Sequence, residues 1–356
     1  MSVRALIGIL LAAVFLVTFR VVLPTWIKDY LNGHLDQIGP YHGEIEDVDL
    51  SLYRGAYRII NLTIEKRRED GPAETMLRAP EVDLAVSWRN LWEGAIVGEV
   101  HFLEPELIYA RTKDVAHSPD DREVDWRAYL ETLFPLRINE MSVRDGSLTI
   151  VLPSAKPPVE LHATAVAIRV TNLTNVRDVE GKRDAALEGT AEVLGDAPLE
   201  VVARFDPWGT FDNFSLDLRL TQVDITRLNA LAQAYLGIDI ASGQGDFVME
   251  LDAHQGRLRG YAKPLLNNLD IYEWKQDVQD DDPPMQVLWE GLTDAISQLF
   301  TNQPKARFAT RIPIEGDLEN PGVGALESIL GILRNAFVEA YDAYFEDVEL
   351  SDRPAS

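Results

Sequence analysis

The chain has 356 residues, 46% of them hydrophobic, and a formal net charge of −25 from 58 acidic and 33 basic side chains. This length allows one large domain or two ordinary ones with a sizeable core. The acidic balance argues against nucleic-acid binding, which needs clustered Lys and Arg, and against broad adhesion to anionic lipid headgroups. There is no cysteine, so disulfides, thiolate zinc sites and cysteine nucleophiles are excluded.

The N-terminal segment is apolar. Ala5 to Phe19 carries no charge, and the run extends to Leu23 if Arg20 reaches the membrane interface. No small residues mark a cleavage site, which favours an uncleaved signal anchor over a cleaved signal peptide or a buried helix. We expect residues 1–24 to be a transmembrane anchor. Arg4 marks the cytoplasmic side, and the bulk of the chain then lies on the far side of the membrane.

Residues 25–276 read as a β-rich domain. A short helix over 27–32 is followed from Gly43 by apolar residues that alternate with polar ones. Turns are expected at Tyr53-Arg54-Gly55, Leu91 to Gly94, Asp145-Gly146 and Gly256. Further strands are expected over 161–170, 185–193, 199–205 and 214–220. The pattern predicts a mainly β fold with some helix, built on a long antiparallel sheet, a barrel or a sandwich.

Helices are expected at four further places. One covers 125–130, and another covers Ile225 to Leu236, with Asp224 as N-cap and Gly237 at its end. Residues 277–356 form an acidic linker and two amphipathic helices, over 285–300 and 326–345, with a short β segment. The 285–300 helix presents one apolar face made of Leu288, Trp289, Leu292, Ile296 and Leu299.

No catalytic or metal-binding motif is found. The six histidines lack metal-ligand spacing, and His42-Gly43-Glu44 reads as a loop at a strand start. The acidic run Asp280-Asp281-Asp282 lacks the spaced oxygen ligands of a calcium loop. We therefore expect no cofactor and no enzymatic activity.

The order of several short motifs resembles the AsmA-like envelope proteins, in the branch with domain of unknown function 748. The likeness spans nearly the whole chain and is carried by four stretches: residues 23–32 with Asp49-Leu50 and Tyr53-Arg54-Gly55; Ala79-Pro80-Glu81-Val82 with Trp88, Leu91, Gly94 and Glu104-Pro105-Glu106-Leu107; Leu228-Asn229 with Tyr235, Gly243, Gly245 and Gly260-Tyr261-Ala262-Lys263; and Gly316 with Asn320-Pro321 and Leu333-Arg334-Asn335-Ala336-Phe337.

The resemblance implies an inner-membrane helix and a periplasmic β-rich domain. That domain would be built on a long curved antiparallel sheet that forms an open trough with an apolar interior. The resemblance also implies a role in moving phospholipid toward the outer membrane. It supplies no catalytic residues, and this chain is shorter than the large members. Phospholipid acyl chains are then the expected partner, with a possible envelope protein partner. The candidate groove residues share one strand parity: Leu50, Leu52, Val82, Leu84, Val86, Leu107, Leu148, Ile150 and Leu152.

Two other functions stay open. An anchored scaffold would have a filled interior and an apolar patch elsewhere. A membrane-tethered enzyme would have a polar cleft with converging titratable groups.

Overall fold

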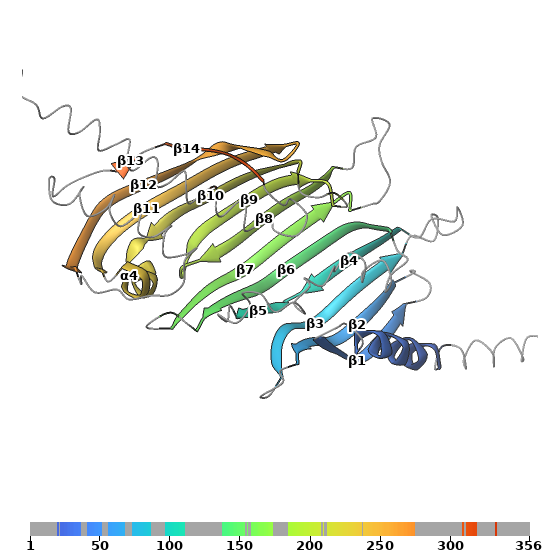
Figure 1. Cartoon of the computed structure of the whole chain (residues 1–356). Coiled ribbons are helices and arrows are strands. Elements are labelled where there is room, and N and C mark those ends of the chain that lie inside the picture. The colour runs from blue at the N-terminus through green and yellow to red at the C-terminus, as the bar shows by residue number, and fades with distance from the viewer. Residues whose placement is uncertain are drawn as a thin grey trace, which may run out of the picture. The chain divides into compact units, whose positions relative to one another are not determined.

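The computed structural model describes residues 20, 22–36, 41–51, 56–67, 73–86, 97–110, 137–153, 155, 158–173, 184–207, 209, 212–236, 238–274, 308–309, 311–318 and 332. The protein is mainly β with few helices, as the alternation predicts. It divides into an N-terminal unit, residues 1–108 with 124–147, and a C-terminal unit, residues 109–123 with 148–356. In Figure 1 the colour runs from blue at the N-terminus to red at the C-terminus, so the N-terminal unit is drawn mainly in blue to green and the C-terminal unit mainly in green to red.

The N-terminal unit holds a sheet in the order β1-β2-β3-β4-β6. β5 continues the path of β4 after Glu104 and Pro105, and it pairs with β3 and β6. The predicted hairpin around residues 52–55 is confirmed by the antiparallel pairing of Ser51 with Ala56. The strands are β1 (Tyr41–Ser51), β2 (Ala56–Lys66), β3 (Glu74–Val86), β4 (Val97–Leu103), β5 (Glu106–Ala110) and β6 (Arg137–Leu152), of which residues 137–147 belong to this unit.

Two predictions for β6 are wrong. Asp145-Gly146 is not a turn, because β6 runs straight through it, with Asp145 at φ 53° as a local irregularity. The backbone of β6 on either side of this point is hydrogen-bonded to residues 104 and 105, which separate β4 from β5. The Glu104 N–H donates to the Arg144 carbonyl at 2.8 Å, and the Ser147 N–H donates to the Pro105 carbonyl at 2.8 Å. β6 also pairs with β4 in parallel, so the sheet is not purely antiparallel.

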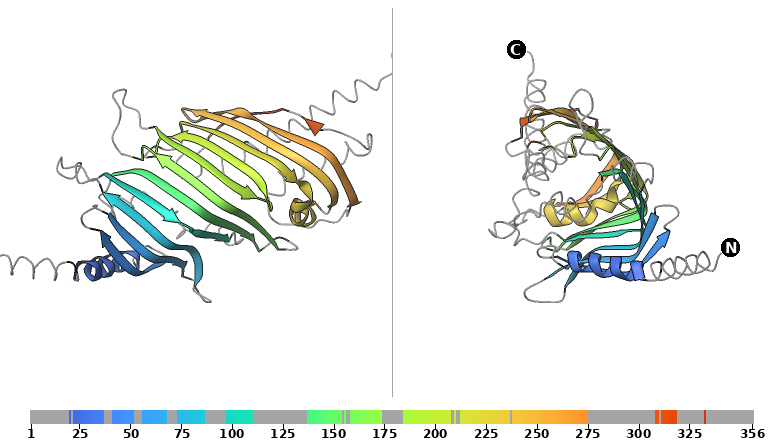
Figure 2. Two further views of the ribbon diagram at one scale, coloured as in Figure 1. Left: turned by 180° about the vertical axis from the view of Figure 1, so that it is seen from behind. Right: turned by 90° about the vertical axis from the view of Figure 1, so that its right-hand side faces the viewer.

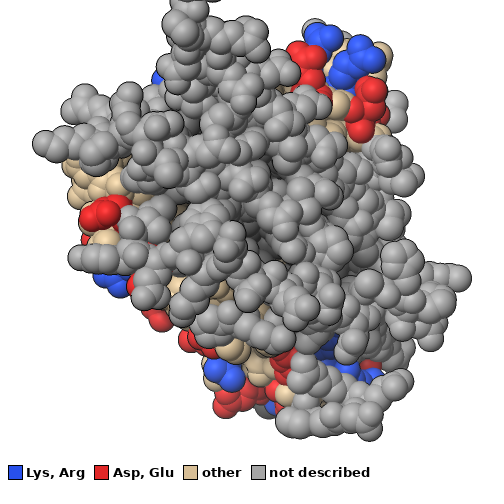
Figure 3. Space-filling model, turned by 60° about the vertical axis from the view of Figure 1, so that its left-hand side comes forward, with Lys and Arg blue, Asp and Glu red and all other residues tan. Residues whose placement is uncertain are grey.

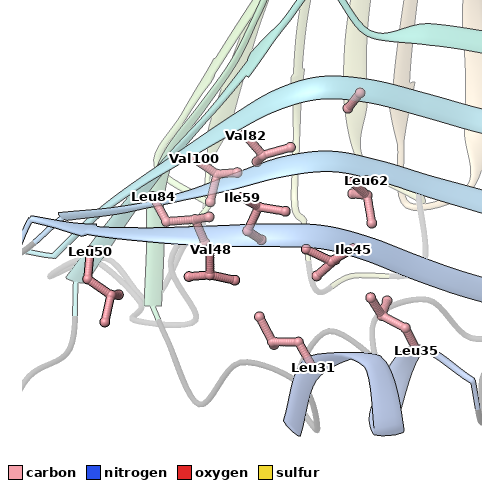
Figure 4. Close-up of a cluster of buried hydrophobic side chains, with 11 residues drawn as sticks. Leu31, Leu35, Ile45, Val48, Leu50, Ile59, Leu62, Val82, Leu84 and Val100 are labelled. Carbon is pink, nitrogen blue, oxygen red and sulfur yellow. The ribbon is translucent and has the colours of Figure 1, made fainter. Parts of the chain in front are cut away.

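The N-terminal helix, residues 22–35, covers one face of this sheet (Figure 4). Leu31 and Leu35 point from the helix toward the strands, and Leu23 and Ile27 pack against the same cluster. These positions recur every four residues, a spacing that keeps them on one helix face. The cluster is completed from the strands by Ile45, Val48, Leu50, Ile59, Leu62, Ala79, Val82, Leu84 and Val100.

The C-terminal unit holds strands in the order β7-β8-β9-β10-β11-β12, with β13 and β14 both on β12. The strand pairs described within this unit are all antiparallel, and the predicted strands are confirmed. β11 and β12 meet at the expected turn, where Gln255 and Gly256 both have positive φ, as a two-residue hairpin loop requires. The strands are β7 (Val159–Thr171), β8 (Ala185–Val193), β9 (Ala197–Phe205), β10 (Phe214–Asp224), β11 (Ile238–His254), β12 (Arg257–Trp274), β13 (Phe308–Ala309) and β14 (Ile312–Asp317).

The predicted helix over 225–236 is confirmed as η3 (Ile225–Leu228) followed by α4 (Asn229–Leu236). Asp224 is the N-cap, since its carboxylate accepts from the Thr226 N–H at 3.0 Å. A hydrogen bond from the Thr226 hydroxyl, together with this backbone bond, holds the pKa of Asp224 below its usual value. α4 lies against one face of the C-terminal strands (Figure 2), where Leu231, Ala232 and Ala234 are buried.

Several expectations fall outside the described residues. These are residues 1–19 of the predicted anchor, the helix over 125–130, the linker, and the amphipathic helices apart from Ile332. Within the described ranges, no helix is both long and apolar enough to cross a membrane.

One asparagine in each unit joins a helix to the free side of a strand. Asn32 of the N-terminal helix accepts from the Ile45 N–H at 2.8 Å and donates to the Ile45 carbonyl at 3.2 Å. Asn229 of α4 does the same for Ile240 of β11, at 2.7 Å and 3.0 Å. A side-chain amide offers the same donor and acceptor as a peptide group. Each asparagine therefore completes the hydrogen-bond ladder where no neighbouring strand does so.

We predict that Asn32→Asp lowers the free energy of unfolding by about 1–3 kcal/mol, because a carboxylate cannot donate to the Ile45 carbonyl. Denaturant titration measures the effect. The matched control is Asn172→Asp, at an exposed position with φ 59° that aspartate also tolerates. Equal stability of Asn32→Asp and the control would show that this clamp, the pair of hydrogen bonds between the Asn32 amide and the Ile45 backbone, contributes nothing to stability.

Candidate functional site

The sheet of the C-terminal unit has one apolar and one polar face, because the strand registers keep side chains of like character opposite one another. One row on the apolar face crosses seven strands, about 29 Å at 4.8 Å per strand. It consists of Ile168, Gly189, Val201, Leu218, Met249, Ala262 and Ile312. The next row is Val170, Leu187, Ala203, Leu216, Leu251, Gly260 and Ile314.

The opposite face carries charges. Moving one residue along the strands changes the first row to Arg169, Glu188, Val202, Asp217, Glu250, Tyr261 and Pro313. Arg311 lies 4.0 Å from the centre of the Tyr261 ring, and a hydrogen bond to Glu250 raises the pKa of the Tyr261 hydroxyl. Arg169, Glu188, Asp217 and Glu250 are exposed, so this face is hydrated. Figure 3 gives one side of the molecule, on which described Asp and Glu side chains lie beside Lys and Arg side chains.

Two clusters fill the ends of the apolar face. At the α4 end, Leu231, Ala232 and Ala234 pack with Val159, Ala197 and other strand residues. At the β14 end, Leu258, Ala262, Ile312 and Ile314 are buried, and Ile332 packs against them. A Cβ placed on Gly316 would lie 2.7 Å from Ile332, so this residue of the C-terminal segment sits directly on the strand.

Between these clusters lies a surface that we name the central apolar face. Its side chains are only half-buried, and neither described cluster includes them. β8 contributes small residues here, Gly189 and Ala191, so little side-chain volume stands above that strand. The central apolar face is defined by Ile168, Leu187, Leu199, Val201 and Leu218.

The N-terminal sheet has the same two-faced register but a filled apolar face. Its clearest apolar row is Leu50, Tyr57, Leu84, Val100 and Met141. Leu50 and Leu84 are 8% and 4% exposed, and burial raises the pKa of Tyr57 to about 12. Leu50, Tyr57, Leu84 and Val100 lie in or against the cluster that the N-terminal helix packs on, so the chain itself occupies this part of the surface.

The predicted groove residues therefore fall into different surroundings. Leu50, Val82 and Leu84 are buried in the N-terminal cluster, whereas Leu107 is 44% exposed on β5. Leu148 and Ile150 are half-buried and Leu152 is buried in the α4 cluster. Leu52, the Val86 side chain and the predicted helix face Leu288, Trp289, Leu292, Ile296 and Leu299 lie outside the described residues.

A serine and a histidine meet on the polar face of the N-terminal sheet. His101 and Ser142 pair across β4 and β6, and His101 Nδ1 lies 2.7 Å from Ser142 Oγ. Glu99 Oε2 is 3.6 Å from His101 Nε2, so the order of groups is that of a hydrolytic triad. Ser142 is only 6% exposed within the strand, which leaves a substrate no access. The contact satisfies a buried hydroxyl.

No sequence signal could have found this contact, because it depends on the parallel register of two strands separated by more than 30 residues. Among the described residues, no three His, Asp or Glu side chains gather closely enough to hold a metal ion. His42, in the segment His42-Gly43-Glu44, is hydrogen-bonded through its Nδ1 to the Asp36 carboxylate at 2.7 Å.

Comparison with known proteins adds no assignment. No protein-family model matches the chain, and no curated protein sequence matches it significantly. The fold thus defines a class only: a mainly β protein whose sheets each have one apolar and one polar face. These faces are the features that bear on its function.

We predict that Leu84→Asp lowers the free energy of unfolding by roughly 3 kcal/mol or more, because it removes a buried side chain and leaves a carboxylate unpaired. Val202→Asp is the control, since Val202 is 46% exposed on the polar face. It should cost about 1 kcal/mol or less. Thermal unfolding measures both, and a Leu84→Asp protein as stable as the control would mean that this face is open to water.

Proposed function

We propose that the chain binds the acyl part of a membrane phospholipid on the central apolar face, and that it serves lipid handling for the outer membrane from an inner-membrane anchor. The observation that carries the proposal is the half-buried apolar row over β7–β11, which is continuous in register and bounded by a charged opposite face.

The central apolar face leaves apolar side-chain area partly exposed to water. Side chains such as Val201 and Leu218 are half-buried, so an acyl chain laid across them removes further apolar surface from solvent. Each buried CH₂ contributes about 0.8 kcal/mol. The rows run across strands and their apolar character is uninterrupted, so a chain can bind in several registers. That property suits a carrier of acyl chains of different lengths.

The charge distribution fits recognition through tails and not headgroups. The chain has a net charge of −25, so electrostatic attraction to anionic headgroups is weak. The polar face keeps the protein soluble while the apolar face is occupied. The resemblance to AsmA-like envelope proteins and the apolar run over residues 5–19 point to the same compartment.

An anchored scaffold is the second candidate, and one observation favours it. Ile332 already lies on the apolar face against Gly316, and the N-terminal unit fills its own face with a helix. If the C-terminal segment covers the central apolar face in the same way, that face is an ordinary core and the protein acts through another surface.

The decisive pair of positions is Val201 and Val202. They are the same residue type, adjacent in β9, and lie on opposite faces. We predict that a photo-reactive benzoylphenylalanine at 201 crosslinks to phospholipid in cells, because the probe lies over the apolar row, and that the same probe at 202 does not. Mass spectrometry of the crosslinked protein identifies the adduct.

The outcomes separate the candidates. Lipid adducts at 201 alone support lipid binding. Crosslinks from 201 to the C-terminal segment of the same chain, without lipid, would favour the scaffold. Equal lipid labelling at 201 and 202 would mean that the sheet has no sided contact with lipid.

A further inference from the structure

The N-terminal helix is apolar on two sides. One side packs on the sheet through Leu31 and Leu35. The outward side exposes Val22, Trp26 and Tyr30, with exposed fractions of 56%, 61% and 45%. They lie four residues apart, so they form one stripe along the helix. The Trp26 and Tyr30 rings stack with centroids 5.8 Å apart.

The stripe is not needed to attach a helix to this fold. α4 makes the same pair of hydrogen bonds with Asn229, yet among the described side chains over residues 225–234 the exposed ones are Arg227, Ala230 and Gln233, none of them aromatic. Exposing an indole and a phenol costs solubility and adds nothing to the clamp. The aromatic stripe therefore requires a separate explanation.

We propose that this stripe rests in the headgroup–acyl boundary of a lipid bilayer. The argument for a bilayer as the occupant is continuity along the chain: the uncharged run Ala5 to Phe19 directly precedes the helix that carries the stripe. Trp and Tyr combine an apolar ring with a polar tip and are enriched at membrane interfaces. The Asp29 carboxylate is exposed beside the stripe and does not attract anionic headgroups. We therefore expect the stripe to dock on a bilayer of neutral lipid.

The inference rests on the membrane attachment proposed above but not on lipid binding by the central apolar face. Docking along this helix would hold the N-terminal sheet at a fixed distance from the bilayer, because Asn32 and the buried leucines fasten the helix to β1. The Lys28 ammonium, which donates to the Glu46 carbonyl at 2.5 Å, adds a further link to the same strand.

The test uses the full chain, which has no cysteine and so accepts a single label cleanly. Gly33 lies on the exposed side of the helix, and a Cβ there meets nothing within 4 Å, so Gly33→Cys places an NBD probe beside an intact stripe. In phosphatidylcholine vesicles we expect blue-shifted emission and quenching by lipids spin-labelled near the headgroup. Ala230→Cys is the matched control on the second helix, and its probe should report water.

Trp26→Asp in the Gly33→Cys background should reduce the quenching by spin-labelled lipid at least several-fold. A Leu16→Cys probe reports the apolar run separately. Quenching at 16 with a water-like probe at 33 would overturn the docking proposal while leaving the anchor intact. Water-like probes at both would overturn the attachment on which it rests. A blue shift at 33 that needs no lipid would mean that a second copy of the chain covers the stripe, and it would also overturn the proposal.

Discussion

The structure depends on strand registers that keep apolar side chains opposite apolar ones. Successive strand residues point to opposite faces, so a slip of one residue would exchange the two faces. Local irregularities preserve the match. Gln222 has φ 57° where the β10–β11 register shifts between Leu220 and Val223, and both of those residues remain packed in the α4 cluster. A two-faced sheet follows in each unit, and each apolar face must be covered by something.

The two units differ in how that cover is supplied. The N-terminal helix lies over Ile45 and Leu62 and closes the cluster (Figure 4), while α4 covers only one end of the C-terminal face. Asn32 and Asn229 make both arrangements possible, because each satisfies strand backbone groups that a docked helix would otherwise leave unpaired. The half-buried residues of the central apolar face are what remains after α4 and β14 have packed.

Local patterns predicted much of this and non-local pairing accounts for the rest. Alternation located most strands and one face of each, and Asp224 marked the start of the second helix because capping is a local property. The parallel pairing of β4 with β6 joins segments separated by residues 104–136, so a local pattern cannot predict it. Asp145-Gly146 has the local signature of a turn, yet β6 continues through it. The burial of Leu84 could not be predicted either, because it depends on where the N-terminal helix docks. Periodicity shows that a face is apolar but not what covers it.

We propose that a lipid, and not the chain alone, covers the central apolar face. Native mass spectrometry of the chain after detergent removal tests it most directly, with Val201→Asp and Val202→Asp compared with the unaltered protein. The account predicts a phospholipid-sized mass retained by the unaltered protein and by Val202→Asp, and lost from Val201→Asp. A bare protein mass in all three, with folding intact, would contradict it.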